Sequence, residues 1–316
     1  MYEVQKITLE EKEKLFSKIA AKPLYECKAN IYGICVKLFT DSPEHKEMWE
    51  DNFHPMLDSI RPHARIFSIK SGKKMKVKYE PTSKTVFIEN CDYYGWIKSI
   101  GLGVAAEYLE DVRSEHRRYS IHGSYVDFGG NGIALIGPSG SGKTTLTYGL
   151  LLERFTNFLT DDWMFVRIAN DVLVHSSEKN SYVRGNIAED WKQYAQKLKT
   201  LCHKEPDCQG RHIVDVRMLF GNDRIMKSSV MGAAVLLVNN KNKPAFEELD
   251  AEDAIKYLVK NNFCNPHQLS RNPRKNWMRK QFYSELFERV PVYMLNIANE
   301  TPRESVERVL GIIEEE

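Results

Sequence analysis

The chain lacks the features that mark membrane-spanning and secreted proteins. No run of apolar residues in its 316 positions approaches the roughly 20 residues that cross a bilayer. The first six residues lack the apolar core of a signal peptide. We therefore expect a cytoplasmic protein with no membrane partner.

Cysteine and an excess of one charge are also scarce. Six cysteines are scattered over the chain, and the spacing of Cys202 and Cys208 matches no CxxC zinc knuckle, so we expect reduced thiols. Lys and Arg number 45 against 43 acidic residues, a net charge of +2. This balance offers no basic stripe for nucleic acid, so we expect no nucleic-acid partner.

What the sequence does contain is an ordinary globular composition, with 42% hydrophobic residues, and a length sufficient for two modest domains or one large one. Residues 1–115 predict a small α+β domain without a catalytic pattern. We expect helices at 9–20, from Pro43 and at 100–113, and strands at 31–39, 64–69, 74–79 and 85–89. The charged residues 115–118 separate two apolar segments and place the boundary at 115/116, although for the charges themselves we favour a solvated helix end.

Residues 116–316 predict a second domain with a different pattern. Strands are expected at 124–128, 133–136, 158–160 and 233–238, with a hairpin turn at 129–132. Helices are expected at 144–153, 251–260 and 301–314. The alternation of strands and helices predicts an α/β class for this domain.

The strongest motif is a glycine-rich loop between a predicted buried strand and a predicted helix. It matches the Walker A pattern and reads Gly137-Pro138-Ser139-Gly140-Ser141-Gly142-Lys143-Thr144, followed by Thr145. Backbone N–H groups in such a loop form an anion nest, and the helix N-terminus adds its positive dipole. We expect Lys143, in a solvent-accessible loop, to meet the β- and γ-phosphates, and Thr144 to bind Mg²⁺. A glycine turn without a ligand is the alternative.

Two adjacent carboxylates, Asp161 and Asp162, close the strand predicted at 158–160. Phosphoryl transfer to a hydroxyl requires a carboxylate for the metal and a base for the proton. Carboxyl ends of strands line the ligand crevice of an open α/β sheet, so we expect this pair to face the glycine loop. Neighbouring side chains on an extended segment point to opposite sides, which suits two different roles. A solvated turn or helix N-cap is the alternative.

In order and spacing these motifs resemble HPr kinase/phosphorylase and its relatives, whose core also resembles phosphoenolpyruvate carboxykinase. Residues 122–127 resemble the family's His-Gly strand, 137–145 its glycine loop and 159–162 its Ala-Asp-Asp motif. Arg184-Gly185 is similar to the start of its Arg-Gly signature. The resemblance covers roughly residues 119–190. It implies a P-loop-containing core of HPr kinase type with a smaller N-terminal α+β domain.

The resemblance also implies a role for each matching residue. Asp161 would be the general base toward the acceptor hydroxyl, and Asp162 would hold Mg²⁺ together with Thr144. His122 would orient or tune an aspartate, and Arg184 would neutralise the transferring phosphate. By chemistry alone, His122 is also an ordinary strand-end histidine and Arg184 also a surface arginine.

The sequence departs from the family at one position that matters for the metal. The family's acidic residue two positions before the signature arginine is Tyr182 here, and Glu178 is the nearest carboxylate. The second metal ligand is therefore open. The short signature provides no ground for the reverse phosphorolysis of the bifunctional enzymes. The N-terminal third looks more like divergent HPr-kinase-related proteins, some of which phosphorylate serine in peptides.

A basic stretch at residues 265–280 includes Trp277 and several arginines and lysines. It has the composition of an anion clamp or a mobile lid. We favour a loop that feeds a helix at 277–287, with Met278, Phe282 and Leu286 inward and the charges solvated.

Together the motifs predict an ATP- and Mg²⁺-dependent kinase with a hydroxyl acceptor, which is a serine of a protein or peptide or a small alcohol such as a free amino acid or sugar. The alternative is a nucleotide-binding regulatory or assembly ATPase that transfers phosphate to no substrate. A carboxykinase-like reaction is a third possibility, without a visible second metal site. The acceptor, the preferred donor and a homo-oligomeric state stay open, because specificity lies in loops and pocket shape.

Overall fold

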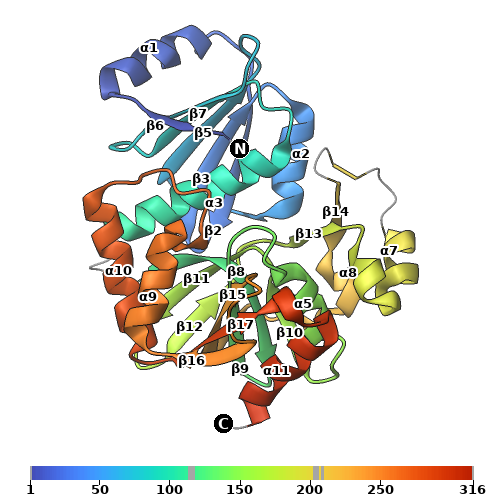
Figure 1. Cartoon of the computed structure of the whole chain (residues 1–316). Coiled ribbons are helices and arrows are strands. Elements are labelled where there is room, and N and C mark those ends of the chain that lie inside the picture. Colours follow the sequence, from blue (N-terminus) through green and yellow to red (C-terminus); the bar gives the residue numbers. More distant parts are fainter. Residues whose placement is uncertain (1, 113–117, 202–205, 208–209, 315–316) are drawn as a thin grey trace. The chain divides into compact units, whose positions relative to one another are not determined.

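The computed structural model describes residues 2–112, 118–201, 206–207 and 210–314, and its class is mixed α/β, as predicted (Figure 1). The chain forms two compact units. The first comprises Met1–Arg113 with the short segments Ser177–Lys179 and His267–Arg271, and the second comprises the remainder. The boundary predicted at 115/116 lies outside the described residues and stays a prediction.

The first unit is a sheet covered by helices on both faces. Its strands are β1 (Val4–Lys6), β2 (Tyr25–Ile31), β3 (Ile34–Thr40), β4 (His54–Pro55), β5 (Ala64–Ile69), β6 (Lys76–Glu80) and β7 (Thr85–Glu89), in the order β1-β6-β7-β5-β3-β2-β4. Its helices are α1 (Leu9–Ile19), α2 (Pro43–Asn52) and α3 (Tyr94–Asp111). Ile19 of α1 packs with Phe67 and Phe87 on one face. Trp49 of α2 lies against Gly101 of α3 on the other, where a Cβ would approach the indole to 2.7 Å.

Sequence and structure differ most in the first unit at the strand predicted for residues 31–39. The structure has a hairpin there, with Ile31 paired to Ile34 across the two-residue turn Tyr32-Gly33. Both turn residues have positive φ, 50° and 81°, as a type I′ turn requires. The apolar run continues on both sides of the turn, so hydrophobicity alone hid it. The strands at 64–69 and 85–89 are confirmed, while α3 begins at Tyr94 rather than at residue 100.

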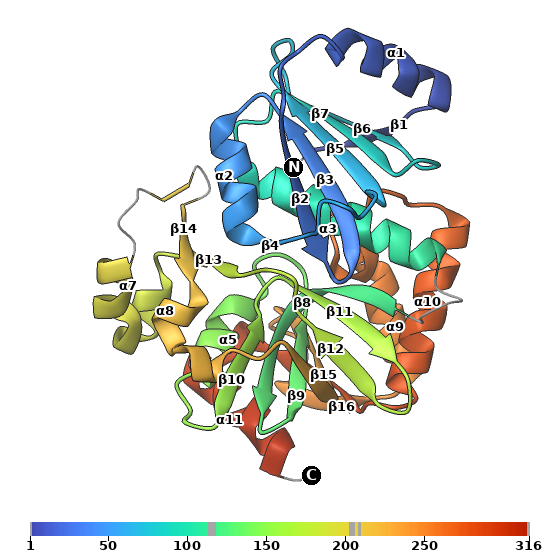
Figure 2. The same ribbon diagram turned by 180° about the vertical axis from the view of Figure 1, so that it is seen from behind.

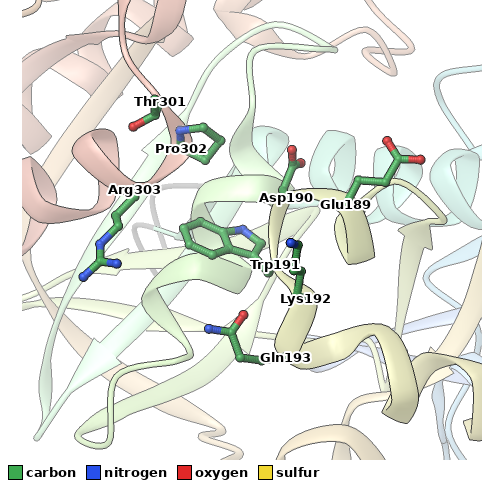
Figure 3. Close-up of a pocket in the computed structure, with 8 residues that line it drawn as sticks. All are labelled: Glu189, Asp190, Trp191, Lys192, Gln193, Thr301, Pro302 and Arg303. Atoms are coloured by element: carbon green, nitrogen blue, oxygen red, sulfur yellow. The ribbon is translucent and has the colours of Figure 1, made fainter.

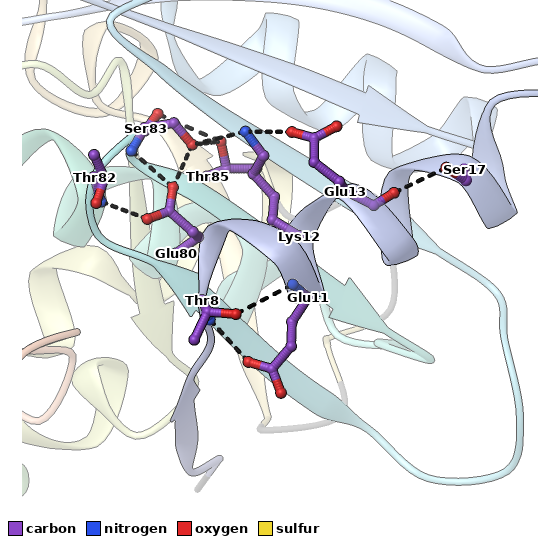
Figure 4. Close-up of polar contacts among 9 residues, drawn as sticks. All are labelled: Thr8, Glu11, Lys12, Glu13, Ser17, Glu80, Thr82, Ser83 and Thr85. Atoms are coloured by element: carbon purple, nitrogen blue, oxygen red, sulfur yellow. Dashed lines mark hydrogen bonds and ion pairs between the residues drawn. The ribbon is translucent and has the colours of Figure 1, made fainter.

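Side chains cap the start of α1 and the turn between β6 and β7 (Figure 4). The backbone N–H of Thr8 donates to Glu11 at 2.8 Å, and the N–H of Glu11 donates to the Thr8 hydroxyl at 3.2 Å, which makes a capping box. Glu80 accepts backbone hydrogen bonds from Thr82 and Ser83, each at 2.7 Å. These local bonds explain why both boundaries are visible in the sequence.

The second unit is built on a mixed sheet (Figure 2), and the pairing of its strands closes on itself. Strands β8, β9, β15, β12 and β11 pair in that order, and β11 pairs back to β8. Strands β10 and β17 flank this ring, β16 pairs with β17, and β13 pairs with β14 separately. The bounds are β8 (Arg118–Phe128), β9 (Asn131–Ile136), β10 (Thr156–Thr160), β11 (Trp163–Ile168), β12 (Val172–His175), β13 (Asn180–Arg184), β14 (Arg211–Asp215), β15 (Ser228–Val238), β16 (Phe246–Leu249) and β17 (Val292–Asn296).

Helices cover both faces of this sheet. They are α5 (Lys143–Leu150), α6 (Ile187–Asp190), α7 (Ala195–Leu201), α8 (Val216–Phe220), α9 (Ala251–Lys260), α10 (Pro273–Phe287) and α11 (Pro302–Glu314), with 3₁₀ turns at Lys192–Tyr194, Asn222–Arg224, Asn262–Cys264 and Ile297–Asn299. One core cluster joins the sheet to α9 and α10, and another joins it to α5 and α11 (Figure 1). The predicted helices at 251–260 and 301–314 are confirmed within one residue.

The structure corrects one expectation for the basic stretch at residues 265–280. Helix α10 begins at Pro273, four residues before the predicted start, because Asn272 caps it and proline suits the first turn. Met278, Phe282 and Leu286 are inward as predicted, but Lys275 and Arg279 are buried rather than solvated. No helix within the described ranges is long and apolar enough to span a membrane. Cys202 and Cys208 lie outside those ranges.

Candidate active site

The glycine loop, residues 137–144, follows β9 directly and runs into α5. Gly140 and Gly142 have φ of 83° and 82°, a region that favours glycine, and Gly142 is the residue before the helix. A Cβ on Gly137 would lie 2.4 Å from the Ser141 hydroxyl. The backbone conformation of this loop therefore favours glycine at these three positions.

Lys143 crosses back over its own loop. Its ammonium donates to the carbonyl of Gly137 at 2.6 Å and to that of Pro138 at 3.1 Å. The side chain is only 9% exposed, so the expectation of a solvent-accessible lysine is wrong. Burial lowers the pKa of Lys143, and the nearby charges of Asp162 and Asp161 oppose that shift.

Strand directions explain why the aspartate pair comes close to the glycine loop. Strands β9 and β10 both run antiparallel to β8, so they point the same way. The loop follows β9, and Asp161-Asp162 follows β10 at the same level of β8. The predicted open sheet is corrected in one respect: Asp161 and Asp162 do not end an open strand, because β11 continues along β8 immediately after them, with Trp163 paired to His122.

The two aspartates face different partners. The Asp162 carboxylate lies 3.3 Å from Nε2 of His122, and its carbonyl accepts from the N–H of Gly123 at 2.9 Å. Asp161 instead accepts a hydrogen bond from the hydroxyl of Ser181 on β13. The opposite directions agree with the expected alternation along an extended segment.

His122 is buried in β8 beside Trp163, whose ring lies edge-on at 5.9 Å. Burial lowers the pKa of His122, and the hydrogen bond to Asp162 opposes this shift. A neutral imidazole is thus favoured near neutral pH. Such a ring can hold the Asp162 carboxylate by one N–H.

Cys264 is a neighbour of this group that the sequence reasoning missed. Its backbone acts on His122 and its thiol lies near the Lys143 ammonium. The residue is buried and belongs to the turn Asn262–Cys264, in which each residue has a φ between 51° and 54°. Left-handed backbone at three successive non-glycine residues gives no signal in a single sequence.

The structure does not bring Arg184 into the same group. Arg184 ends β13 and is exposed, and strand alternation places it with Tyr182 on the face opposite Ser181. Glu178, the nearest carboxylate in sequence, is bound within the first unit by Lys98 at 2.8 Å and by the Asn52 amide at 3.3 Å. The role expected for Arg184 stays a prediction, and Glu178 is already neutralised by Lys98.

A pocket of about 630 Å³ surrounds Trp191 (Figure 3), and two of its lining residues contact Thr145 in the first turn of α5. The Thr145 hydroxyl donates to Asp190 at 3.2 Å, and the Trp191 indole N–H donates to the Thr145 carbonyl at 2.8 Å. In Figure 3 the Trp191 ring lies between Asp190 and Arg303. The lining residues are Glu189, Asp190, Trp191, Lys192, Gln193, Thr301, Pro302 and Arg303.

Comparison with known proteins supports the resemblance predicted from the motifs. No protein-family model matches the chain. A stretch of 77 residues, 24% of the chain, is 35% identical to an HPr kinase/phosphorylase of Chlorobium limicola and covers 22% of that protein's length. A solved structure of the Hpr(Ser) kinase/phosphatase from Coxiella burnetii aligns with 62% of this chain and 99% of its own, at 16% identity and a TM-score of 0.35, which is too low to assign the fold.

Proposed function

We propose that this chain, a divergent relative of the HPr kinase/phosphorylases, is an ATP- and Mg²⁺-dependent kinase that transfers the γ-phosphate to a hydroxyl. The observation that carries the proposal is the surroundings of Lys143. This buried ammonium lies behind the glycine loop and within electrostatic reach of both Asp161 and Asp162. A phosphate-binding cation, a metal carboxylate and a base are the parts that phosphoryl transfer needs.

The donor nucleotide would lie along α5. Its phosphates would occupy the nest of residues 137–144, where Lys143 exchanges its carbonyl contacts for phosphate oxygens. The nucleoside would extend past Thr145 toward the pocket beside Trp191, since the Trp191 indole that lines this pocket donates to the Thr145 carbonyl. Phosphate and nucleoside sites would thus share one helix.

The residues present fit a magnesium ion. Thr144 and Asp162 offer hydroxyl and carboxylate oxygens, the hard ligands that Mg²⁺ prefers, and Asp162 keeps 29% of its side chain exposed. Within the described ranges no three His, Cys, Asp or Glu side chains are arranged as a metal site. Mg²⁺ takes few protein ligands and completes its shell with phosphates and water. When bound, the ion would neutralise charge on the transferring phosphate.

Asp161 would act on the acceptor. Its carboxylate takes the proton of the acceptor hydroxyl as that oxygen forms a bond to the γ-phosphorus, and the bond from phosphorus to the β–γ bridging oxygen breaks. The products are the phosphorylated acceptor and the nucleoside diphosphate. Asp161 is buried, so the acceptor hydroxyl would have to enter the site to meet its carboxylate. The acceptor class is a serine of a protein or peptide, or a small alcohol.

Label transfer tests this proposal. The purified chain is incubated with γ-labelled ATP and Mg²⁺ in the presence of a protein extract or a metabolite extract, and label is followed in each fraction. We expect label in one of the two. Phosphate release without transfer to either would favour the regulatory ATPase instead.

Lys143→Met tests whether the glycine loop takes part in this reaction. Methionine fills the buried space of the lysine stem without its charge, so the fold should persist. We expect loss of nucleotide binding by calorimetry and loss of label transfer. A folded Lys143→Met variant with unchanged nucleotide affinity and turnover would remove the glycine loop from the proposed mechanism.

A further inference from the structure

We propose that Ser181, backed by Tyr148, is a positioning residue that fixes the orientation of the Asp161 carboxylate toward the acceptor. The inference rests on the proposed function, because it gives a task to the base. It concerns two residues that no motif singles out. The carrying observation is a continuous chain of buried hydrogen bonds from Tyr148 through Ser181 to Asp161.

The direction of each hydrogen bond in this chain follows from the groups present. An ionised Asp161 only accepts, so the single hydroxyl proton of Ser181 goes to Oδ2 of Asp161. The Ser181 oxygen then accepts from the Tyr148 hydroxyl at 3.0 Å. Ser181 and Tyr148 are both fully buried, so water does not compete for these bonds.

Strand alternation sets the position of Ser181. On β13, Ser181 and Val183 are buried, whereas Tyr182 is half-buried and Arg184 is exposed. Pairing of Ser181 with Val214 of β14 fixes this register. A shift by one residue would turn Tyr182 inward and remove the hydroxyl from Asp161.

Tyr148 connects Asp161, through Ser181, to the helix that follows the proposed phosphate-binding loop. It lies on α5, the helix that begins at Lys143. Its carbonyl accepts from the Tyr194 hydroxyl at 2.9 Å, and the two rings meet edge-on at 5.4 Å. The position of Asp161 is thereby tied to the same rigid element as Lys143.

This arrangement matters because the terminal torsion of an aspartate is broad and roughly two-fold. One fixed donor on Oδ2 selects a single rotation of the carboxylate and aims its other oxygen. A base displaced by about 1 Å can lose on the order of 10²-fold in rate. Ser181 therefore acts on turnover through Asp161 and leaves the phosphate nest untouched.

The same unit contains a matched control. Tyr125 donates to Ser229 at 3.1 Å, and Ser229 donates to Asp127 at 2.5 Å, all three being buried. Ser229→Ala removes a serine-to-aspartate hydrogen bond of the same kind, away from the glycine loop. It separates the general cost of such a deletion from an effect on the base.

The test measures kcat and KM for Mg·ATP in two assays. The first follows transfer of label from γ-labelled ATP to the extract fraction that the wild type labels. The second follows release of phosphate, for which water is the acceptor. Ser181→Ala should lower kcat about 10- to 100-fold, the range for a hydrogen bond to a charged group, with KM unchanged. Tyr148→Phe should lower it about 2- to 10-fold. Ser229→Ala should leave both constants unchanged. In an Asp161→Asn background, Ser181→Ala should cause no further loss.

Three outcomes would overturn the inference. Ser181→Ala could have the wild-type kcat, or it could lose no more kcat than Ser229→Ala does. In the third, adding Ser181→Ala to Asp161→Asn lowers kcat by as much as Ser181→Ala does alone. Should Ser181→Ala fail to fold, Tyr148→Phe decides alone, because it removes only a hydroxyl. A wild type that binds Mg·ATP and neither transfers label nor releases phosphate defeats the proposed function, and the inference with it.

Discussion

The second unit contains two buried hydrogen-bond chains, Tyr125–Ser229–Asp127 and Tyr148–Ser181–Asp161. They consist of the same three residue types, but their aspartates have different surroundings. Asp127 is fully buried, and its oxygens accept from Ser229, from the N–H of Gly130 and from the Asn157 amide at 3.1 Å. These partners hold the β8–β9 turn, where Gly130 has positive φ. Asp161 receives the equivalent serine bond and is also buried, but its neighbours are the charged Asp162 and Lys143.

The difference shows that a serine partner alone does not decide what a buried aspartate does. At Asp127 both oxygens are used to hold backbone and side-chain donors, so the carboxylate is part of the fold. At Asp161 the neighbours are a second carboxylate and a buried ammonium, a cluster of charges whose burial costs stability and is typical of functional sites. Four substitutions can break or sharpen this comparison.

The largest effect is expected at the proposed base. Asp161→Asn keeps the size of the side chain and the phosphate nest, so Mg·ATP affinity should stay near normal. Removal of a general base should lower phosphate transfer about 10²- to 10⁴-fold. Steady-state kinetics against ATP, beside calorimetric binding, measures both quantities. Transfer at the wild-type rate would show Asp161 to be structural, like Asp127.

The corresponding change in the other chain should act on stability. Asp127→Asn presents an amide N–H₂ to donors from Gly130 and Asn157, so buried donors lose their acceptor. The expected cost is about 1–3 kcal/mol in the free energy of unfolding. Denaturant unfolding measures it, and kcat per folded molecule should not change. A large loss of kcat at full stability would erase the distinction between the two aspartates.

Asp162 tests whether adjacent carboxylates have separate roles. Asp162→Asn removes a charged oxygen from the proposed metal ligands, and each 1.4 kcal/mol lost corresponds to about tenfold in affinity. We expect the Mg²⁺ concentration for half-maximal activity to rise about tenfold, with kcat largely recovered at saturating Mg²⁺. A kcat loss that excess Mg²⁺ does not relieve would assign Asp162 to proton transfer instead.

The smallest effect is expected at the start of the structural chain. Tyr125→Phe removes a hydroxyl that donates to the Val230 carbonyl at 2.6 Å and to Ser229. A buried neutral hydrogen bond contributes about 0.5–1.5 kcal/mol to stability. Thermal unfolding should show that small loss, with turnover unaffected. Equal kcat losses in Tyr125→Phe and Tyr148→Phe would contradict the separate tasks of the two chains.

Patterns that depend on neighbours in sequence were predictable. Ser42 and Pro43 mark the start of α2, and the strands β5 and β7 have the predicted bounds. The turn at Tyr32-Gly33 was missed because its signal is two residues long within an apolar run. The burial of Lys275 was missed because a charged residue on a helix is normally solvated, and tertiary packing overrides that preference.

By itself the sequence determined the glycine loop between a strand and a helix, the adjacent pair Asp161-Asp162 and the mixed α/β class, because glycine conformation and hydrophobic periodicity are local. Only the tertiary structure decided which partner each aspartate meets. The pairing of β8 with β11 brings His122 to Asp162, and packing of β13 brings Ser181 to Asp161, in both cases between residues far apart in the chain. The register of those strands depends on the packed sheet as a whole, so no short stretch of sequence encodes it.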